Sequence, residues 1–336
     1  MKPTIYISNV ATTWILKILG DDIHKNLKTL GYSVHSGSFQ EYKGEDICFH
    51  MWWRTAVPYK EAKTNAVFVT HIDDKGKEHD LLLLKDKFDI FVCMSDEDAQ
   101  FLKELGFDSH KVFGLDLPVR NKYVKPLVLA IFSNCYSDNR KNEKWIIEYC
   151  RTHEDCKLVN FMFLGNGWES VGKALNELQS SFVWYCISRE MPYEYFYQQL
   201  AMMQADYYLY MGMDGGAMGS YDAYALGLNL CISDDGYHKS IPDIEYSFAN
   251  QKDFEKCLDE IIAKQRRKID FFNSHSVENY VKKLAYILEN HSYQPDMNQQ
   301  VFEYSVKDKR RRNYFSMTLH RLKQPFVTMY LKYVKF

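Results

Sequence analysis

The stretch 205-ADYYLYMGMDGGAMGSYDAYALGLNLCIS-233 contains the pattern that decides the fold class. An apolar run of strand length is followed by a glycine-rich turn, a segment that can form a helix and a second apolar run. Short apolar runs that alternate with helices are typical of a parallel sheet with helical crossover connections. The stretch therefore predicts a β-α-β unit.

The same alternation continues on both sides of this stretch. One series of apolar runs lies at 4–8, 46–53, 66–72 and 88–95, and a second series lies at 127–133, 159–165, 181–187, 205–212 and 228–234. A break with two prolines and several basic residues, 117-LPVRNKYVKP-126, separates them. We therefore predict an α/β protein with two Rossmann-like domains facing across a cleft. The predicted segments are domains at 1–122 and 127–290 and a basic, aromatic, helical segment at 291–336.

Composition agrees with a globular protein of this size. The chain has 336 residues, 46% of them hydrophobic and 26% charged, which allows two cores and excludes wholesale disorder. Its eight cysteines are scattered singly and lack zinc-site spacing, which is typical of a reducing compartment. No apolar run reaches the roughly 18 residues of a membrane-spanning helix. We expect a cytoplasmic protein, and a peripheral position on the inner membrane face stays open.

Loops that follow the strands of the second domain are where a ligand is expected, because open α/β sheets bind ligands beyond the carboxyl ends of their strands. Arg140 and Lys141 are predicted to stand at the start of a helix, where they either bind an anion or form a solvated pair. Gly165 and Gly167 form a turn after the next strand, and tight turning alone explains such a pair.

The glycine turn inside the opening stretch lies between two carboxylates, Asp214 and Asp222, which are separated by seven residues. Its glycines permit positive φ and close approach of the backbone to a ligand. We predict that Ser220 caps the following helix and that Asp222 lies in its first turn. Capping by Asp222 and ligand binding by Asp222 both remain open from the residues alone.

Taken together, these loops resemble the carboxyl-terminal domain of GT-B glycosyltransferases, most closely the retaining family 4. That family has a Glu-x7-Glu motif around a glycine-rich turn, and here Asp214-x7-Asp222 stands in register with it. The run 161-FMFLGNGWE-169 resembles the family's strand and glycine turn, and 191-MPYEYFYQQLAMMQADYYLYM-211 resembles the helix and strand that precede the motif. The resemblance in sequence motifs covers about residues 127–250. The first domain resembles the family only in its predicted architecture. Both family glutamates are replaced by the shorter aspartate.

The resemblance implies a role for each residue of the second domain. Asp222 would accept hydrogen bonds from both ribose hydroxyls of a nucleotide-sugar donor, and Asp214 would contact the donor sugar. Lys141 would neutralise the diphosphate, with Arg140 in place of a family arginine that is absent near Tyr136. The remaining implied donor-binding residues are Gly165, Gly167, Ile187, Gly215, Gly216, Ala217, Met218, Gly219 and Ser220. No metal and no cofactor besides the donor is implied.

In the first domain, 67-VFVTHIDD-74 resembles the strand and histidine loop that faces the donor in this family, so His71 would bind a donor-sugar hydroxyl. A purely structural histidine is the alternative. Asp73 and Asp74 either contact acceptor hydroxyls or start a helix. The aromatic and cationic cluster that follows the preceding strand either stacks on an acceptor sugar or belongs to the core; its members are His50, Trp52, Trp53 and Arg54.

We therefore expect a metal-independent glycosyltransferase that moves a hexose-type sugar to a glycan or glycolipid acceptor, with retention, in surface polysaccharide or lipopolysaccharide assembly. Residues 306–336 carry nine Lys/Arg and one Asp, which favours either contact with anionic lipid or a solvated helix face. Nucleic acid is not an expected partner because no reading motif accompanies the charge. A GT-B sugar-nucleotide epimerase and a catalytically silent nucleotide-sugar-binding scaffold are the alternatives.

Overall fold

The computed structural model describes residues 2–8, 14–120, 124–178, 183–187 and 202–293. It divides into two compact units. Among the described residues, the first unit contains 2–126 and 263–293 and the second contains 127–262. The predicted helix before Met202, and the whole basic segment 306–336, lie outside the described residues.

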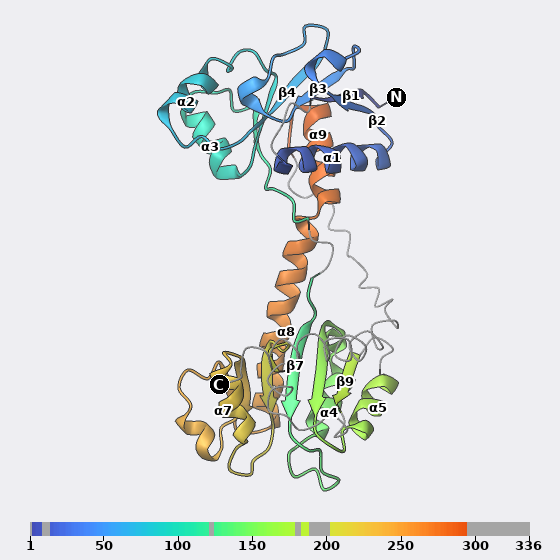
Figure 1. The fold of residues 1–336 in the computed structure, drawn as a ribbon, viewed down its shortest axis with the longest axis vertical. Helices are drawn as coiled ribbons and strands as arrows, with labels where there is room; N and C mark the ends of the chain where they lie inside the picture. Colours follow the sequence, from blue (N-terminus) through green and yellow to red (C-terminus); the bar gives the residue numbers. More distant parts are fainter. Residues whose placement is uncertain (1, 9–13, 121–123, 179–182, 188–201, 294–336) are drawn as a thin grey trace, which may run out of the picture. The chain divides into compact units, whose positions relative to one another are not determined.

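The first unit is built on a parallel sheet of six described strands in the order β2-β1-β3-β4-β5-β6 (Figure 1). The strands are β1 Thr4–Ser8, β2 Ser33–Gly37, β3 Ile47–His50, β4 Thr64–Val69, β5 Ile90–Cys93 and β6 Val112–Gly114. The helices are α1 Trp14–Thr29, α2 Lys75–Leu82, α3 Asp96–Glu104 and α9 Val277–Asn290, with the short 3-10 helices η1 Phe39–Glu41 and η2 Trp53–Thr55.

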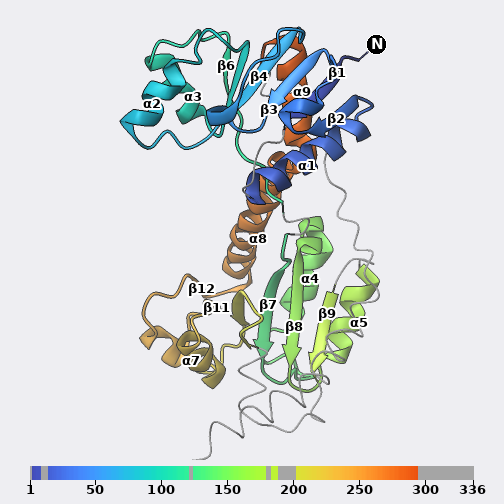
Figure 2. The same ribbon diagram turned by 45° about the horizontal axis from the view of Figure 1, so that its top comes forward.

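Helices cover both faces of this sheet. Ala66 and Phe68 of β4 pack in one core with α1 and α9, and the alternate residues Val67 and Val69 pack in another with α2 and α3. This alternation follows from the period of two in a strand, and burial of both faces explains the continuous apolar runs. Figures 1 and 2 both show α9 alongside α1. The sequence prediction placed residues 263–290 in the second domain, whereas they belong to the first unit, where α9 packs on the sheet.

The second unit also has a parallel sheet of six described strands, in the order β12-β11-β10-β7-β8-β9. The strands are β7 Leu127–Phe132, β8 Val159–Leu164, β9 Val183–Ile187, β10 Tyr207–Tyr210, β11 Asn229–Ser233 and β12 Tyr246–Phe248. The helices are α4 Lys144–Thr152, α5 Glu169–Leu178 and α7 Met218–Ala225, with the 3-10 helices η3 Glu154–Leu158 and η4 Gly236–Ser240. Helix α8 Gln251–Ser274 begins in this unit, and its residues from 263 onward belong to the first unit. The prediction of two Rossmann-like α/β domains is confirmed.

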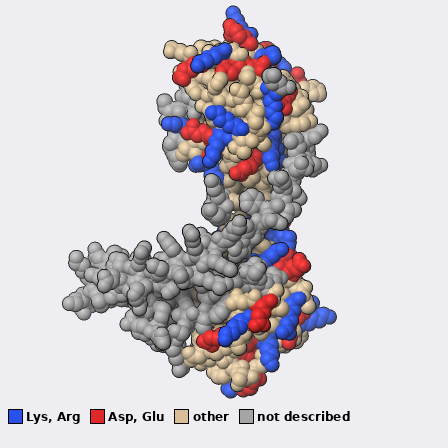
Figure 3. Space-filling model, turned by 90° about the vertical axis from the view of Figure 1, so that its right-hand side faces the viewer, with Lys and Arg blue, Asp and Glu red and all other residues tan. Residues whose placement is uncertain are grey.

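Charged side chains are mixed by sign on the face drawn in Figure 3, where Lys and Arg stand beside Asp and Glu on both units. That face therefore offers no extended surface of one sign among the described residues. Among the described residues, no helix is both long enough and apolar enough to cross a membrane.

Candidate active site

The strand order of the second unit sets the place of the site. From β7 the chain proceeds outward through β8 and β9, and it then returns to the other side of β7 with β10, β11 and β12. The connections that follow β7 and β10 therefore leave the sheet in opposite directions. In open parallel sheets the crevice at such a switch point is where ligands bind.

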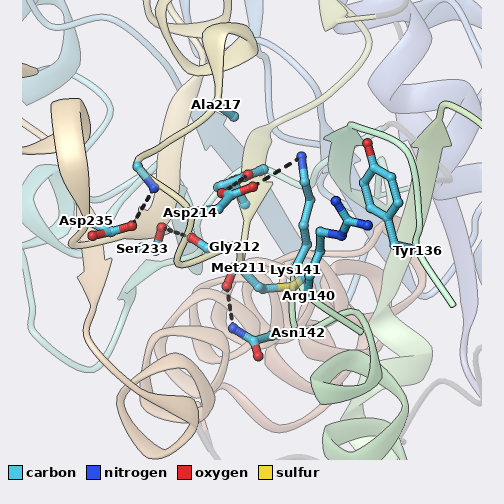
Figure 4. A network of polar contacts seen from close by, with 12 residues as sticks. Tyr136, Arg140, Lys141, Asn142, Met211, Gly212, Asp214, Ala217, Ser233 and Asp235 are labelled. Atoms are coloured by element: carbon cyan, nitrogen blue, oxygen red, sulfur yellow. Dashed lines mark hydrogen bonds and ion pairs between the residues drawn. The ribbon is translucent and has the colours of Figure 1, made fainter. Parts of the chain in front are cut away.

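Lys141 and Asp214 meet at this switch point (Figure 4). Lys141 lies in the loop after β7 and Asp214 in the turn after β10, and Lys141 Nζ is 3.7 Å from Asp214 Oδ2. A second contact joins the same two loops, because Asn142 Nδ2 donates to the carbonyl of Met211 at 2.8 Å. The Lys141 side chain is 17% exposed and that of Asp214 37% exposed, so the pair is open to a ligand from solvent.

Tyr210 orients the Asp214 carboxylate. The buried Tyr210 hydroxyl donates to Asp214 Oδ1 at 2.5 Å, which leaves Oδ2 facing Lys141. Burial, together with this hydrogen bond to a carboxylate, raises the pKa of Tyr210 far above its ordinary value. Tyr210 therefore stays protonated and remains a donor. Because a strand residue holds the carboxylate, the position of Asp214 is set by the sheet.

Arg140 is directed differently from Lys141. Its guanidinium pairs with Asp138, with Nη2 at 3.0 Å from Oδ2, and stacks over the Tyr136 ring at 4.2 Å. The prediction that Arg140 and Lys141 stand at a helix start is wrong, because α4 begins at Lys144 and Glu143 is its N-cap. The two cations instead lie in the irregular loop before the helix, so the α4 dipole does not oppose them.

The glycine turn after β10 leads directly into α7. Gly215 and Gly216 have φ of +91° and +104°, a region that residues with a Cβ rarely adopt. Ala217 is the N-cap of α7, so the prediction that Ser220 caps this helix is wrong: Ser220 lies inside α7 and its hydroxyl contacts His238. Among the described residues, the N–H groups of Met218 and Gly219 find no acceptor, as expected at a helix start.

Asp222 is the second carboxylate of the predicted pair and lies in the middle of α7, which begins four residues earlier at Met218. The prediction of a first-turn position is therefore wrong, and stabilisation by the helix dipole does not account for this carboxylate. Asp222 is partly exposed.

Gly165 and Gly167 lie at the carboxyl end of β8, beside the loop that follows β7. A Cβ on Gly165 would collide with the carbonyl of Ser133, and one on Gly167 with the carbonyl of Cys135. The Trp168 indole N–H also donates to the Ser133 carbonyl, at 2.6 Å. These glycines thus have a packing role between two strand-end loops. Ile187 is the last residue of β9 at the same edge.

Replacing Gly165 by alanine should lower the free energy of unfolding by about 2 kcal/mol or more, since its φ of +137° and the collision with the Ser133 backbone both oppose a side chain. Gly227→Ala is the matched control, because Gly227 has a φ of +75° and nothing within 4 Å of an added Cβ. Its cost should be about 1 kcal/mol. Urea titration of both variants measures the difference, and equal losses would contradict the packing role.

The predicted residues after β4 take local structural roles. Asp74 is the N-cap of α2 and accepts from the N–H of Lys77 at 2.8 Å, and Asp73 pairs with the Lys77 ammonium. His71 is exposed at the carboxyl end of β4 and has a φ of +39°, which is uncommon outside glycine. Helix initiation therefore accounts for the two aspartates, and His71 keeps its ring available to a ligand.

The cluster after β3 divides into core and surface residues. Trp53 is 1% exposed and its indole N–H donates to the Thr70 carbonyl at 2.8 Å. His50 is 2% exposed, stacks on Tyr59, and has a pKa lowered to about 4 by burial. These two are core residues, so neither offers a free ring to an acceptor sugar. Trp52 is partly buried, and Arg54 lies at the surface 3.6 Å from Asp80.

Two site residues were missed by the sequence analysis. Asp235 Oδ2 accepts from the Gly215 N–H at 2.7 Å, and His238 accepts from the Ala217 N–H at 2.9 Å. Both lie in the connection after β11, so the strand-end rule that selected the other loops would also have selected this one. Within the described ranges, no group of three or more His, Cys, Asp or Glu side chains is arranged to hold a metal ion.

Comparison with known proteins yields no matching family model and no matching curated protein. Among solved structures, the chain is similar to the lipopolysaccharide outer core galactosyltransferase WaaB in its apo form, with 12% identity over 85% of this chain and 98% of that one, at a TM-score of 0.34. It is similar to Anabaena Alr3699/HepE in complex with UDP-glucose, with 9% identity over 85% and 94% of the two chains, at a TM-score of 0.33.

A third similar structure is the GtfA/B complex, with 12% identity over 73% of this chain and a TM-score of 0.33. The chain covers 57% of the length of that relative. The assignment of two Rossmann-like units rests on the strand orders themselves and on the parallel pairing within each sheet.

Proposed function

We propose that this chain is a GT-B glycosyltransferase that moves a sugar from a nucleotide-diphosphate sugar to a glycan or lipid-linked glycan acceptor. The observation that carries the proposal is the meeting of Lys141 and Asp214 at the switch point of the second sheet. At this point Lys141 is a cation that can bind a diphosphate, and Asp214 beside it is a carboxylate that can bind sugar hydroxyls. The two lie on loops that follow the neighbouring strands β7 and β10.

Lys141 is the diphosphate contact in this proposal. Its ammonium lies 5.2 Å from the Tyr210 ring centroid and 5.5 Å from that of Tyr136, and its partner Asp214 shares its charge with Tyr210. Among the described residues, the ion pair that a diphosphate would have to displace from Lys141 is the long one to Asp214, at 3.7 Å. When the bond between the anomeric carbon and the diphosphate breaks, negative charge grows on the leaving oxygen, and a fixed cation stabilises that charge.

The turn and the helix start bind the remainder of the donor. The N–H groups of Met218 and Gly219 stand at the α7 N-terminus, where an anion is favoured. Asp222, one turn further along α7, accepts from the ribose hydroxyls, for which a carboxylate has enough acceptor sites. Arg140 adds positive charge next to the site, although its guanidinium is paired with Asp138.

The reaction proceeds on one face of the sugar with retention. The acceptor oxygen forms a bond to the anomeric carbon as the bond to the diphosphate breaks, and the acceptor proton passes to a phosphate oxygen of the leaving group. Asp214 and Asp222 bind and orient the donor, in contrast to the acid and nucleophile of glycoside hydrolases. Metal independence belongs to this proposal, with Lys141 and the α7 N-terminus supplying the positive charge.

Acceptor binding is assigned to the first domain, with Trp52 and Arg54 as acceptor contacts and the exposed His71 as a further contact to a sugar hydroxyl. Asp73 and Asp74 keep their structural roles at the start of α2. The acceptor class we propose is a surface polysaccharide or glycolipid intermediate. Contact of the basic segment 306–336 with an anionic membrane would bring the enzyme to a lipid-linked acceptor.

A thermal-shift panel of nucleotide sugars, UDP-glucose among them, tests the proposal on the full chain. At least one nucleotide sugar should raise the melting temperature, and the same compound should be consumed when a glycan acceptor is added. Activity should persist in EDTA. A new sugar nucleotide formed from the donor alone would indicate an epimerase instead. Binding without turnover on any acceptor would indicate a silent binding protein.

Replacing Asp222 by alanine should weaken nucleoside diphosphate binding roughly tenfold, the effect of losing one charge-assisted hydrogen-bonding group. Isothermal titration calorimetry measures it. Glu177→Ala is the control, because Glu177 is an exposed carboxylate on α5 of the same unit. An unchanged affinity in the Asp222 variant would remove the ribose role from this residue.

A further inference from the structure

His238 lies beneath the glycine turn and contacts the residues around it. It lies in η4, is fully buried, and contacts three separate segments. Its Nε2 is 2.9 Å from the Ala217 nitrogen and 2.8 Å from Ser220 Oγ, and its Nδ1 is 2.9 Å from the Ser233 carbonyl oxygen. The turn, α7 and the end of β11 are thus joined through one imidazole.

The partners of the ring determine its hydrogen-bonding state. A backbone N–H can only donate, so Nε2 is the acceptor for Ala217. A carbonyl oxygen can only accept, so Nδ1 carries the proton and donates to Ser233. His238 is therefore a neutral imidazole with its proton on Nδ1. A side chain in its place must offer an acceptor to Ala217 and a donor to Ser233 at the same time.

Further hydrogen bonds from residues near His238 fix the backbone of the glycine turn. Asp235 accepts from the Gly215 N–H at 2.7 Å, and the Ser233 hydroxyl donates to the Gly212 carbonyl at 2.6 Å. The His238 ring also packs edge-to-face on Tyr210, with centroids 5.5 Å apart, and lies so close to Gly216 that an added Cβ would stand 3.0 Å from its Cδ2. Tyr210 in turn orients Asp214.

We infer that His238 is a positioning residue for the nucleotide-sugar site, and this inference rests on the proposed function. It holds Ala217 so that Asp214 faces Lys141 on one side of the turn and the N–H groups of Met218 and Gly219 point outward on the other. Without the Nε2 acceptor, the buried Ala217 N–H would have to leave its position to find water, because an unpaired buried donor is costly. Gly215 and Gly216, which precede Ala217, have no side chains that could resist this movement.

Two substitutions by amide side chains test the two imidazole nitrogens of His238 independently. Glutamine in His238→Gln is long enough to place an acceptor oxygen near the position of Nε2. Asparagine in His238→Asn is shorter and reaches only the position of Nδ1, where it can donate to Ser233. Both variants remove the ring and keep a polar amide, and they differ in the contact that they retain: glutamine retains the contact to Ala217 and asparagine the contact to Ser233.

The test measures nucleoside diphosphate affinity by calorimetry, melting temperature, and amide hydrogen exchange of the ligand-free chain, followed residue by residue over 212–220. His238→Gln should bind within about threefold of wild type. His238→Asn should bind at least about tenfold more weakly and show faster exchange at Ala217. In wild type, the Ala217 amide should be protected while those of Met218 and Gly219 exchange quickly.

Equal affinities for the Gln and Asn variants would overturn the inference, as would an unprotected Ala217 amide in the wild-type chain. The wild-type exchange measurement decides the matter even if both variants fail to fold. If the wild-type chain binds no nucleoside diphosphate, the proposed function fails, and exchange at Ala217 then still reports separately whether His238 holds the turn.

Discussion

Replacing Lys141 by alanine is expected to weaken nucleoside diphosphate binding about 100-fold, or about 2.7 kcal/mol. The ammonium is the described cation that contacts Asp214 across the switch point, and a charge-assisted contact to phosphate in a partly buried position contributes at this level. Calorimetry with a nucleoside diphosphate measures the loss. Transfer activity should fall at least as far, because the same cation stabilises the leaving group.

Lys144→Ala is the matched control, since Lys144 is an exposed lysine at the first position of α4, three residues after Lys141. It should leave affinity within about twofold of wild type. Lys141→Arg should recover part of the loss, because the charge remains but the planar head differs in shape. If the Lys141 and Lys144 variants lost affinity equally, a general charge effect would replace the proposed contact.

Replacing Asp214 by asparagine is expected to separate binding from transfer. The carboxylate repels a diphosphate and holds Lys141, so its neutralisation should leave nucleoside diphosphate affinity unchanged or increase it by a few fold. Transfer should fall by about 100-fold to 1,000-fold, because the orienting hydrogen bonds to the donor sugar are lost. Calorimetry and a steady-state transfer assay measure the two effects.

Asp234→Asn is the control for this change, because Asp234 is an exposed carboxylate at the same edge of the sheet. Nucleoside diphosphate affinity and transfer activity should both stay near their wild-type values in the Asp234→Asn variant. In the double variant with Lys141→Ala, the gain in diphosphate affinity from Asp214→Asn should shrink, since the two side chains act as a pair. A parallel loss of binding and transfer in Asp214→Asn would contradict the assigned role.

Much of the fold could be predicted because buried parallel strands are continuous apolar runs. β7 and β8 lie where the runs 127–133 and 159–165 predict them, and β10 and β11 lie at the two ends of the opening stretch, as predicted. The strands that were missed give no such signal. β2 reads Ser-Val-His-Ser-Gly with only Val34 buried, and β6 and β12 have three residues each.

The start of α7 shows why local rules did not suffice at the site. Serine is a preferred N-cap, so Ser220 was a reasonable prediction from its neighbours. In the structure its hydroxyl contacts the buried His238 imidazole, and Ala217 takes the cap position instead. A contact between residues far apart along the chain decides where the helix begins, and a propensity rule does not contain that information.

The sequence by itself determined the strands that are continuous apolar runs and the helices between them, though not β2, β6 and β12. It also determined that a cation, a glycine turn and two carboxylates would follow strands of one sheet. Apolar periodicity and turn chemistry are local properties, so they can be read from neighbours. Only the tertiary structure decided that β10 pairs with β7, which brings Asp214 to Lys141, and that α9 packs against α1. Pairing between distant segments depends on the packing of whole surfaces, and so does the place of His238 behind the turn.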